Sequence, residues 1–277
     1  MISNRKAVSS KWVKTQLLLQ SPELSSYVPA TYRLTRSRLL AMLARYGMLY
    51  LKPDRGSLGI GVMRVEKRGR AFLYQSGVQS CSFTAFEDMF QSLQRRIGSR
   101  PYLIQKGISL LAYEGRPFDF RVMIQKNPSG AWESTGIVGR VAHPHKVVTN
   151  GSQGGTIYPA RDLLRPKAGT KRAAGLLQQM DRLARRTAAE FSRIYPAMNE
   201  LGLDIAIDRN LAPWILEVNT RPDPCPFTKL DNKDSIRKMI AYAKAYGRQY
   251  NLVCSKAKRA PRCCASNPAK RPLRKSP

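Results

Sequence analysis

The sequence predicts an α+β fold. Apolar residues recur at helical spacing near the N-terminus and again over residues 170–195. Strand-like runs, separated by glycine-rich turns, fill the stretch between these helices, and two more strands follow the long helix. The chain has 277 residues, 43% of them hydrophobic, which is enough for one large domain or two modest domains with a real core.

Two helices are expected at the start of the chain. Ser9 or Ser10 can cap a first helix that runs through Leu19, because a serine hydroxyl accepts a hydrogen bond from a free N–H of the first turn. A turn-rich link leads to a second helix over residues 35–46, which Gly47 ends. Both helices precede the glycine-rich part of the sequence.

A stretch of strands and one helix comes next. Strands are expected over residues 48–53, 60–67, 71–75 and 103–105. Before the last of them, Thr84 and Glu87 have the spacing of a capping box, and apolar residues at helical spacing follow. This region therefore combines a small sheet with one amphipathic helix.

The middle and the end of the chain follow the same mixed pattern. Strands are expected over residues 118–125, 132–141, 156–158, 203–207 and 214–218. Helices are expected over residues 170–195 and 233–250. The sequence after Leu252 is rich in Lys, Arg, Pro and Ser, has little to bury and is expected to be disordered.

The composition limits the possible partners. Forty-eight Lys and Arg residues oppose eighteen Asp and Glu residues, which gives a formal charge of +30. Such a charge favours an anionic partner such as nucleic acid, an acidic protein or an acidic polymer, and a solvated basic surface is an equally good explanation. Residues 255–277 alone hold eight basic residues and no acidic one.

The sequence also allows a prediction of the compartment and of membrane association. No apolar run reaches the roughly 18 residues that a membrane-spanning helix needs. No signal peptide is recognisable at the N-terminus, and the five cysteines are expected to be free thiols. We therefore expect a cytoplasmic protein without a membrane span.

A glycine-rich hairpin follows the second predicted helix. Residues 49–63 run from an apolar strand through Lys52 to Gly56, Gly59 and Gly61, and then into a second strand. Glycine lets the backbone turn at positive φ and approach a ligand closely, and a lysine beside such a loop can place its charge on a phosphate. The hairpin therefore suits a nucleotide triphosphate, although glycines between strands also occur in plain turns.

Acidic residues lie on the last two predicted strands. Glu217 and Asn219 are two residues apart and so share one face of their strand, while Asp204 and Asp208 belong to the strand before. Magnesium prefers oxygen ligands, and carboxylates flanked by apolar residues are costly to bury without a cation. The pattern favours a Mg²⁺ site over its alternative, acidic residues on a solvent-facing edge.

Asp119 and Arg121 alternate with apolar residues in another predicted strand. They can project together into a cleft, and a cross-strand ion pair on an exposed face is nearly as consistent with the pattern. His143 and His145 are the only histidines and have no third ligand near them in the sequence. We expect these two to be ordinary loop residues.

Six segments between about residues 10 and 250 form a recognisable series. They are Tyr50-Leu-Lys-Pro-Asp-Arg-Gly-Ser-Leu-Gly-Ile-Gly, Leu103-Ile-Gln-Lys-Gly-Ile, Phe118-Asp-Phe-Arg-Val, Val148-Thr-Asn-Gly-Ser-Gln-Gly-Gly, Gly202-Leu-Asp-Ile-Ala-Ile-Asp and Ile215-Leu-Glu-Val-Asn-Thr-Arg-Pro. In order and spacing they resemble the ATP-grasp superfamily. Within it, the chain is similar to the YheC/YheD family of endospore-coat-associated proteins.

The resemblance implies a nucleotide held between two α+β subdomains, and it implies a role for each matching residue. Lys52 would contact the α- and β-phosphates, beneath a flexible lid that contains Gly56, Ser57, Gly59 and Gly61. The remaining implied roles are a hinge against adenine (Gln105, Lys106, Ile108), a contact with the transferred phosphate or the acceptor carboxylate (Arg121, Arg140), a substrate-side loop (Asn150) and magnesium ligands (Asp204, Glu217, Asn219).

The resemblance also implies a domain organisation. A helical N-terminal segment (1–47) would precede an ATP-grasp domain (48–252), which would divide into a lid subdomain (about 48–110) and a catalytic-type subdomain (about 111–252). A disordered basic tail would occupy residues 253–277. The pre-ATP-grasp domain common in the superfamily would be absent or reduced to the first helices.

Members of the superfamily commonly phosphorylate a carboxylate with ATP, and an amine then attacks the acyl phosphate. The resemblance therefore implies an ATP- and Mg²⁺-dependent, carboxylate–amine ligase-like protein associated with the spore coat, and an acidic peptide or polymer acceptor would suit its charge. The alternative is a non-catalytic structural coat protein that keeps the fold and binds acidic partners through its basic surface. Nucleic-acid binding is a third, weaker hypothesis, because no basic motif is interleaved with aromatic residues.

Overall fold

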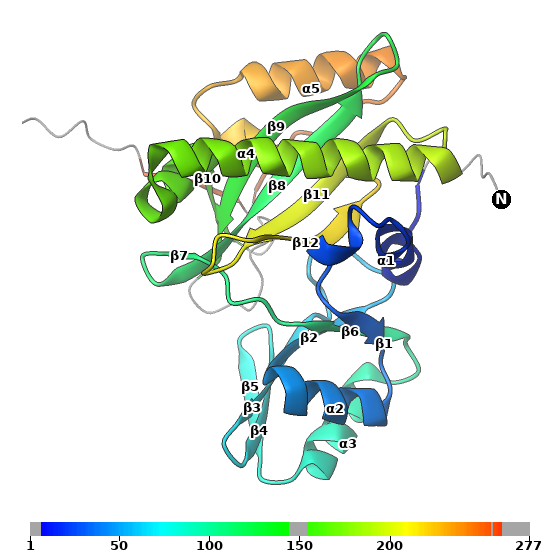
Figure 1. Cartoon of the computed structure of the whole chain (residues 1–277), viewed down its shortest axis with the longest axis vertical. Coiled ribbons are helices and arrows are strands. Elements are labelled where there is room, and N and C mark those ends of the chain that lie inside the picture. Colours follow the sequence, from blue (N-terminus) through cyan, green and yellow to red (C-terminus); the bar gives the residue numbers. More distant parts are fainter. Residues whose placement is uncertain (1–6, 144–153, 256, 262–277) are drawn as a thin grey trace, which may run out of the picture.

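The computed structural model describes residues 7–143, 154–255 and 257–261, which form two bodies, each built on one β-sheet (Figure 1). The smaller body, at the bottom of Figure 1, comes from the first part of the chain, and the larger body above it comes mainly from the remainder. Both bodies combine helices with sheets, which confirms the predicted α+β class.

The small body is a six-stranded antiparallel sheet with two helices packed on it. Its strands follow the spatial order β1 (Thr31–Arg33), β6 (Tyr102–Lys106), β2 (Met48–Pro53), β3 (Met63–Arg68), β4 (Ala71–Ser76) and β5 (Gln79–Phe83). Helices α2 (Arg36–Tyr46) and α3 (Phe86–Ile97) share a core with Leu49 and Leu51 of β2. Because side chains alternate along a strand, Lys52 lies on the other face of this sheet, toward the large body.

The large body is a second sheet with helices on both faces. Its strands follow the order β12 (Pro213–Asn219), β11 (Glu200–Ile207), β8 (Arg116–Lys126), β9 (Trp132–Val141), β10 (Thr156–Pro159) and β13 (Lys258–Arg259), and β7 (Ala112–Tyr113) pairs with β8. Phe120 of β8 packs with helix α4 (Ala160–Ile194). Met123 faces the other way and packs with helix α5 (Asp234–Ala245) and the short helix η3 (Cys225–Lys229).

The first helix belongs to the large body. Helix α1 (Lys11–Gln20) contacts β12 and α4, and its Leu18 enters the core beneath α4; the short helix η1 (Ser25–Tyr27) follows. Ser10 caps α1 by accepting a hydrogen bond from the Val13 N–H, as the sequence indicated. Helix α2 packs in the small body instead, so the stretch expected as one N-terminal segment (1–47) is divided between the two bodies.

Most predicted helices and strands are present, but some bounds differ. Helix α4 begins at Ala160, ahead of the predicted residue 170, because its first turns already bury Leu163 and Leu164. The helix is interrupted at Gly169, whose φ of 72° is not helical. Helix α5 ends at Ala245, before the predicted residue 250. Strands β1, β5, β7 and β13 were not predicted, since they are short or polar.

Two further predictions are wrong. The capping box of Thr84 and Glu87 does not form: Ala85 is the N-cap of α3, and Glu87 pairs with Arg36 of α2 instead. The disordered tail was predicted from residue 253, but strand β13 (Lys258–Arg259) pairs in parallel with β10. The rest of that tail, from residue 262, lies outside the described residues.

Candidate functional site

A cavity of about 200 Å³ lies between the two bodies. The predicted site residues that line it are Lys52, Gly56, Ser57, Gly59, Gln105, Lys106, Ile108, Arg121, Arg140, Asp204, Glu217 and Asn219. Gly61 is not in contact with the cavity, and Asn150 lies outside the described residues. Twelve side chains or backbone positions that are far apart in the sequence therefore meet in one place.

Strand register explains how the large sheet contributes its charged residues. Asp204 of β11 pairs with Arg121 of β8 on one side and with Glu217 of β12 on the other. Asp119 of β8 pairs with Arg140 of β9. Since directly opposed residues point to the same face, four neighbouring strands present one row of charged side chains to the cavity.

Four of these residues form what we call the arginine cluster: Asp119, Arg121, Arg140 and Asp204. Arg140 donates from two nitrogens to the two carboxylate oxygens of Asp119, over 2.8 and 2.6 Å, and also lies 3.1 Å from Asp204 Oδ1. Arg121 Nε donates to the same Oδ1 over 2.6 Å. All four side chains are buried, so the alternative of a cross-strand ion pair on an exposed face is excluded for Asp119 and Arg121.

The arginine cluster keeps Asp204 ionised. Burial alone would raise the pKa of this carboxyl, but the charges and hydrogen bonds of Arg121 and Arg140 outweigh the burial and lower the pKa to about 2. Burial likewise opposes the charge of Arg140, yet the two aspartates raise its pKa above the ordinary arginine value. Asp204 and Arg140 are therefore both charged at neutral pH.

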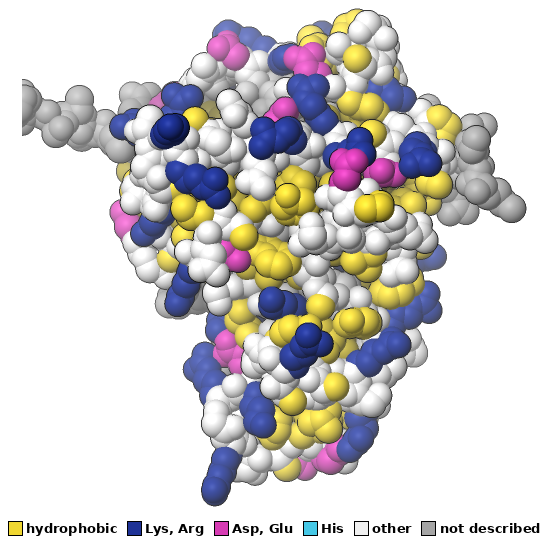
Figure 2. Space-filling model, in the orientation of Figure 1, with side chains coloured by type: hydrophobic (Ala, Val, Ile, Leu, Met, Phe, Trp, Pro, Cys, Tyr) yellow, Lys and Arg dark blue, Asp and Glu magenta, His cyan; other side chains and the backbone are white. Residues whose placement is uncertain are grey.

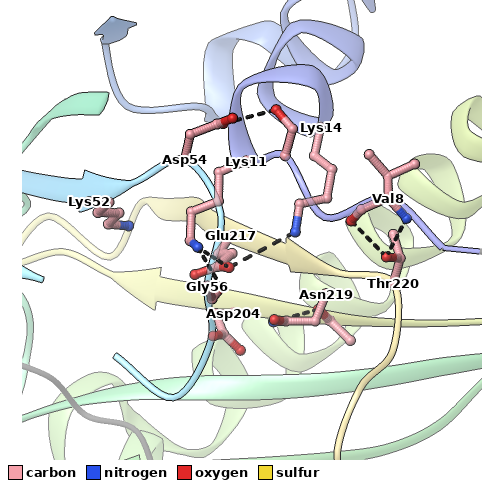
Figure 3. Close-up of polar contacts among 12 residues, drawn as sticks. Val8, Lys11, Lys14, Lys52, Asp54, Gly56, Asp204, Glu217, Asn219 and Thr220 are labelled. Carbon is pink, nitrogen blue, oxygen red and sulfur yellow. Dashed lines mark hydrogen bonds and ion pairs between the residues drawn. The ribbon is translucent and has the colours of Figure 1, made fainter. Parts of the chain in front are cut away.

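A second set of residues, the lysine cluster, surrounds Glu217 (Figure 3). It consists of Lys11 and Lys14 from α1, Lys52 from β2, and Glu217 itself. The Lys11 and Lys14 ammonium nitrogens lie 3.7 and 4.0 Å from Glu217 Oε1. Burial lowers the pKa of both Lys14 and Lys52, against the opposing effect of the Glu217 charge. The cavity thus concentrates positive charge beside one carboxylate.

Gln105 positions Lys52. The Lys52 ammonium donates to Gln105 Oε1 over 2.6 Å and to the Leu216 carbonyl over 3.3 Å. Gln105 Nε2 donates in turn to Thr31 Oγ1 over 3.1 Å. The buried amide therefore bonds to protein partners here, and its contact with adenine stays a prediction. Of the expected hinge, Lys106 and Ile108 line the cavity directly.

The glycine-rich loop covers the opening of the cavity. Gly56 has a φ of 127°, which glycine adopts readily, and the apolar tip of the loop, Leu58 and Ile60, is exposed. Gly61 serves packing instead: a Cβ there would lie 2.8 Å from the Tyr102 hydroxyl, which donates to the Gly61 carbonyl. The loop therefore lines the cavity through Gly56, Ser57, Leu58, Gly59, Ile60 and Val62, but not through Gly61.

The oxygen donors suit a hard cation. Asp204, Glu217 and Asn219 line the same cavity, and the Asn219 amide nitrogen donates to the Gly202 carbonyl, which leaves its oxygen for another partner. In the described residues no group of three or more His, Cys, Asp or Glu is placed to hold a metal. The set here is two carboxylates and one amide, a donor chemistry that Mg²⁺ accepts because it fills its shell with water and phosphate oxygens.

Sequence reasoning missed two lysines of the site. Lys11 lines the cavity, and Lys14 lies behind it, beside Glu217. The lysines are three residues apart, which places them on one face of a helix, but nothing local shows what that face meets. Asp208 does not reach the site, because its carboxylate accepts from two backbone N–H groups of its own turn and from the Trp214 ring.

Membrane insertion by a helix has no support in this fold. Across the described ranges, none of the helices combines the length and the apolar character needed to span a bilayer.

Comparison with known proteins agrees with this geometry. The chain is 26% identical over 248 residues to the endospore coat-associated protein YheD of Bacillus subtilis (strain 168), which covers 87% of this chain and 54% of YheD. It is 25% identical over 221 residues to the endospore coat-associated protein YheC of the same organism, which covers 78% of this chain and 61% of YheC. The chain therefore spans little more than half the length of these relatives. A family model described as YheC/D like ATP-grasp matches residues 1–249, and the chain belongs to that family.

Proposed function

We propose that the protein binds ATP with Mg²⁺ in this cavity and transfers the γ-phosphoryl group to a carboxylate, which an amine then attacks. The observation that supports this most directly is the charge of the cavity. Six lysine or arginine residues and four acidic residues line it within the described part of the chain. An excess of cations beside oxygen ligands suits a triphosphate that arrives with a divalent cation.

Each side of the cavity has a separate task in this reaction. Lys52, held by Gln105, lies beneath the glycine-rich loop and would bind phosphate oxygens. Asp204, Glu217 and Asn219 would hold Mg²⁺, which when bound neutralises charge on the phosphates. The exposed loop tip would cover the nucleotide and exclude water. Such a reaction needs positioning and charge neutralisation more than it needs a side-chain base.

The two arginines are not equivalent in this scheme. Arg140 is held by both oxygens of Asp119 and by Asp204, so its role is to hold the row of charges in place. Arg121 uses its Nε for Asp204 among the described contacts, and the residue lines the cavity. We assign Arg121 to the transferred phosphoryl group, where a cation stabilises the developing charge.

The bonds formed and broken are as follows. A carboxylate oxygen attacks the γ-phosphorus, and ADP leaves with the electrons of the broken phosphorus–oxygen bond. The amine nitrogen then attacks the acyl carbon, phosphate leaves, and the surplus ammonium proton passes to solvent. An acidic peptide is the acceptor we propose, because the chain carries a net charge of +30 and basic side chains are spread over both bodies on the face shown in Figure 2.

Calorimetric titration of ATP with Mg²⁺ tests the binding step. We expect the Lys52→Met variant to bind ATP at least tenfold more weakly than the wild type, because it loses the charged phosphate ligand and keeps the aliphatic packing. Lys67→Met, an exposed lysine of the same sheet, is the matched control and should bind normally. A wild-type protein that binds no ATP would overturn the proposal.

The names of the two relatives favour a second candidate, a structural protein of the spore coat that binds nucleotide without turning it over. Release of ADP and phosphate separates the two candidates. The wild-type protein would be incubated with ATP, Mg²⁺, a glutamate-rich peptide and an amine donor. ADP production that depends on the peptide supports the ligase-like reaction, whereas tight ATP binding without ADP production supports the structural role.

A further inference from the structure

The segment that precedes and opens helix α1 connects the two bodies, and we call residues 8–14 the N-terminal connector. At one end, the Val8 N–H donates to Thr220 Oγ1 over 2.9 Å, and that hydroxyl donates back to the Val8 carbonyl over 3.0 Å. Thr220 directly follows Asn219, the last residue of β12. The connector is therefore fixed to the strand that carries the proposed metal ligands (Figure 3).

The other end of the connector holds the start of the glycine-rich loop. Asp54 Oδ1 accepts hydrogen bonds from Ser10 Oγ over 2.9 Å and from the Trp12 N–H over 2.8 Å. The Asp54 carbonyl accepts from the Lys11 N–H over 2.8 Å. A carboxylate at a helix N-terminus is stabilised by the free N–H groups there. Asp54 thus ties the small body to the first turn of α1.

Lys11 extends this connection into the cavity. Its ammonium donates to the Gly56 carbonyl over 2.8 Å and lies 3.7 Å from Glu217 Oε1. The side chain is almost fully buried, so these two contacts replace the water that its ammonium loses. One ammonium group therefore contacts both the glycine-rich loop of the small body and the metal-ligand strand of the large body.

Side chains from outside the loop hold both of its ends. Tyr102 holds its far end at Gly61, and within the loop the Ile60 N–H donates to the Ser57 carbonyl over 3.2 Å and the Val62 N–H to the Gly59 carbonyl over 3.4 Å. Among the described residues, Lys11 is the side chain that reaches the near end at Gly56. Removing its ammonium would release the part of the loop that lines the cavity.

We propose that Lys11 is a positioning residue that fixes the glycine-rich loop over the phosphate site and couples the loop to Glu217. The inference rests on the proposed function in one respect, that the ligand beneath the loop is a triphosphate. A divalent cation at Glu217 competes with the Lys11 ammonium for the same carboxylate oxygen. Lys11 would then be shared between the Gly56 carbonyl and the phosphates, and the loop would respond to occupancy of the metal site.

Lys14 offers a matched comparison. It lies on the same helix face one turn later, is equally buried and is 4.0 Å from the same Glu217 oxygen. No contact between its ammonium and the loop occurs in the described residues. Lys11→Met and Lys14→Met therefore each remove one buried charge next to Glu217, but only the first removes the bond to Gly56.

Amide hydrogen exchange of the free full-length protein tests the proposal without any nucleotide. We expect the amides of residues 55–62 to exchange at least tenfold faster in Lys11→Met than in the wild type, and at the wild-type rate in Lys14→Met. The β4–β5 hairpin of the small body should be unaffected in both variants. Equal exchange of the loop in wild type and Lys11→Met would overturn the assignment, as would equal acceleration in the two variants.

Nucleotide binding supplies the second measurement. We expect Lys11→Met to weaken the binding of ATP with Mg²⁺ at least tenfold and to leave adenosine binding unchanged, because only the triphosphate lies under the loop. If Lys11→Met accelerates loop exchange but wild-type protein binds no ATP, the proposed function fails and the role of Lys11 stands. Lys11→Gln, which is shorter and uncharged, gives the same exchange prediction should thermal unfolding show that Met is not tolerated.

Discussion

The arginine cluster and the lysine cluster hold neighbouring carboxylates in different ways. Asp204 lies 2.6 and 3.1 Å from its two arginines, whereas Glu217 lies 3.7 and 4.0 Å from its two nearest lysines. The Asp204 side chain is 8% exposed and that of Glu217 is 24% exposed. Asp204 is therefore fixed through its Oδ1 by short, charge-assisted hydrogen bonds, whereas Glu217 is held more loosely and keeps more room for a cation.

The origin of each cluster in the fold explains this difference. All four members of the arginine cluster belong to strands β8, β9 and β11 of one sheet, where register fixes their distances. The lysine cluster combines α1, β2 and β12, which come from both bodies. We infer that the arginine cluster forms as the large sheet folds, and that Lys52 joins the lysine cluster only when the bodies meet. The positions in the arginine cluster are fixed by one sheet, whereas the position of Lys52 in the lysine cluster changes if the two bodies move relative to each other.

The largest effect is expected from Arg140→Met. The Arg140 side chain is 2% exposed and neutralises Asp119 and part of Asp204. Its loss leaves buried negative charge without compensation, which costs about 3–5 kcal/mol of folding free energy. Unfolding in urea, followed by circular dichroism, measures the loss.

Arg193→Met is the control for Arg140→Met. Arg193 also pairs with a carboxylate, Glu190 at 3.4 Å, but its side chain is 77% exposed. An exposed pair of this kind contributes less than about 1 kcal/mol. Similar losses of unfolding free energy in the two variants would show that the arginine cluster does not stabilise the large sheet as we describe.

The second-largest expected effect is a loss of folding stability at low pH, caused by protonation of Asp204. The folded-state pKa of Asp204 is lowered to about 2, below its ordinary value near 3.8, so the associated stability is fully present above about pH 4 and is lost as the pH falls toward 2. The shift corresponds to about 2 kcal/mol. We expect the difference in unfolding free energy between wild type and Asp204→Asn to shrink by that amount between pH 6 and pH 2.

Glu114→Gln is the reference for this pH series. Glu114 is largely exposed and lies 3.5 Å from Arg116, so its replacement should give a small difference that changes little with pH. A wild-type advantage over Asp204→Asn that stays constant down to pH 2 would contradict the charged state assigned to the arginine cluster.

The sequence was informative where the chemistry is local. The glycine-rich loop with Lys52, and the alternation that puts Glu217 and Asn219 on one face, are properties of short segments, so their approach to a common cavity could be predicted. The partners of Asp119 and Arg121 could not be predicted, because they depend on the register between neighbouring strands. Alternation indicates the face on which a side chain lies, but only the pairing of β8 with β9 brings Arg140 to Asp119.

The remaining misses have tertiary causes. Lys11 and Lys14 are more than two hundred residues from Glu217 in the sequence, and only the packing of α1 on β12 brings them together. The capping box failed because a residue from another helix, Arg36, took the Glu87 carboxylate. Helix α4 was shortened because Pro166 and Gly169 suggest an end, whereas the fold keeps a kinked helix that buries Leu163.

The smallest effect on stability is expected from Glu217→Gln. Its ion pairs are long and partly solvated, so we expect a loss of about 1 kcal/mol, well below that of Arg140→Met. The effect on ligand binding should be large instead, because Gln cannot neutralise Mg²⁺: ATP affinity should no longer rise when Mg²⁺ is added. Urea unfolding and calorimetric titration, each with and without Mg²⁺, separate the two quantities. A variant that loses as much stability as Arg140→Met, but keeps a Mg²⁺-dependent ATP affinity, would mean that Glu217 is a structural charge and not a metal ligand, and that the two clusters do not differ as described.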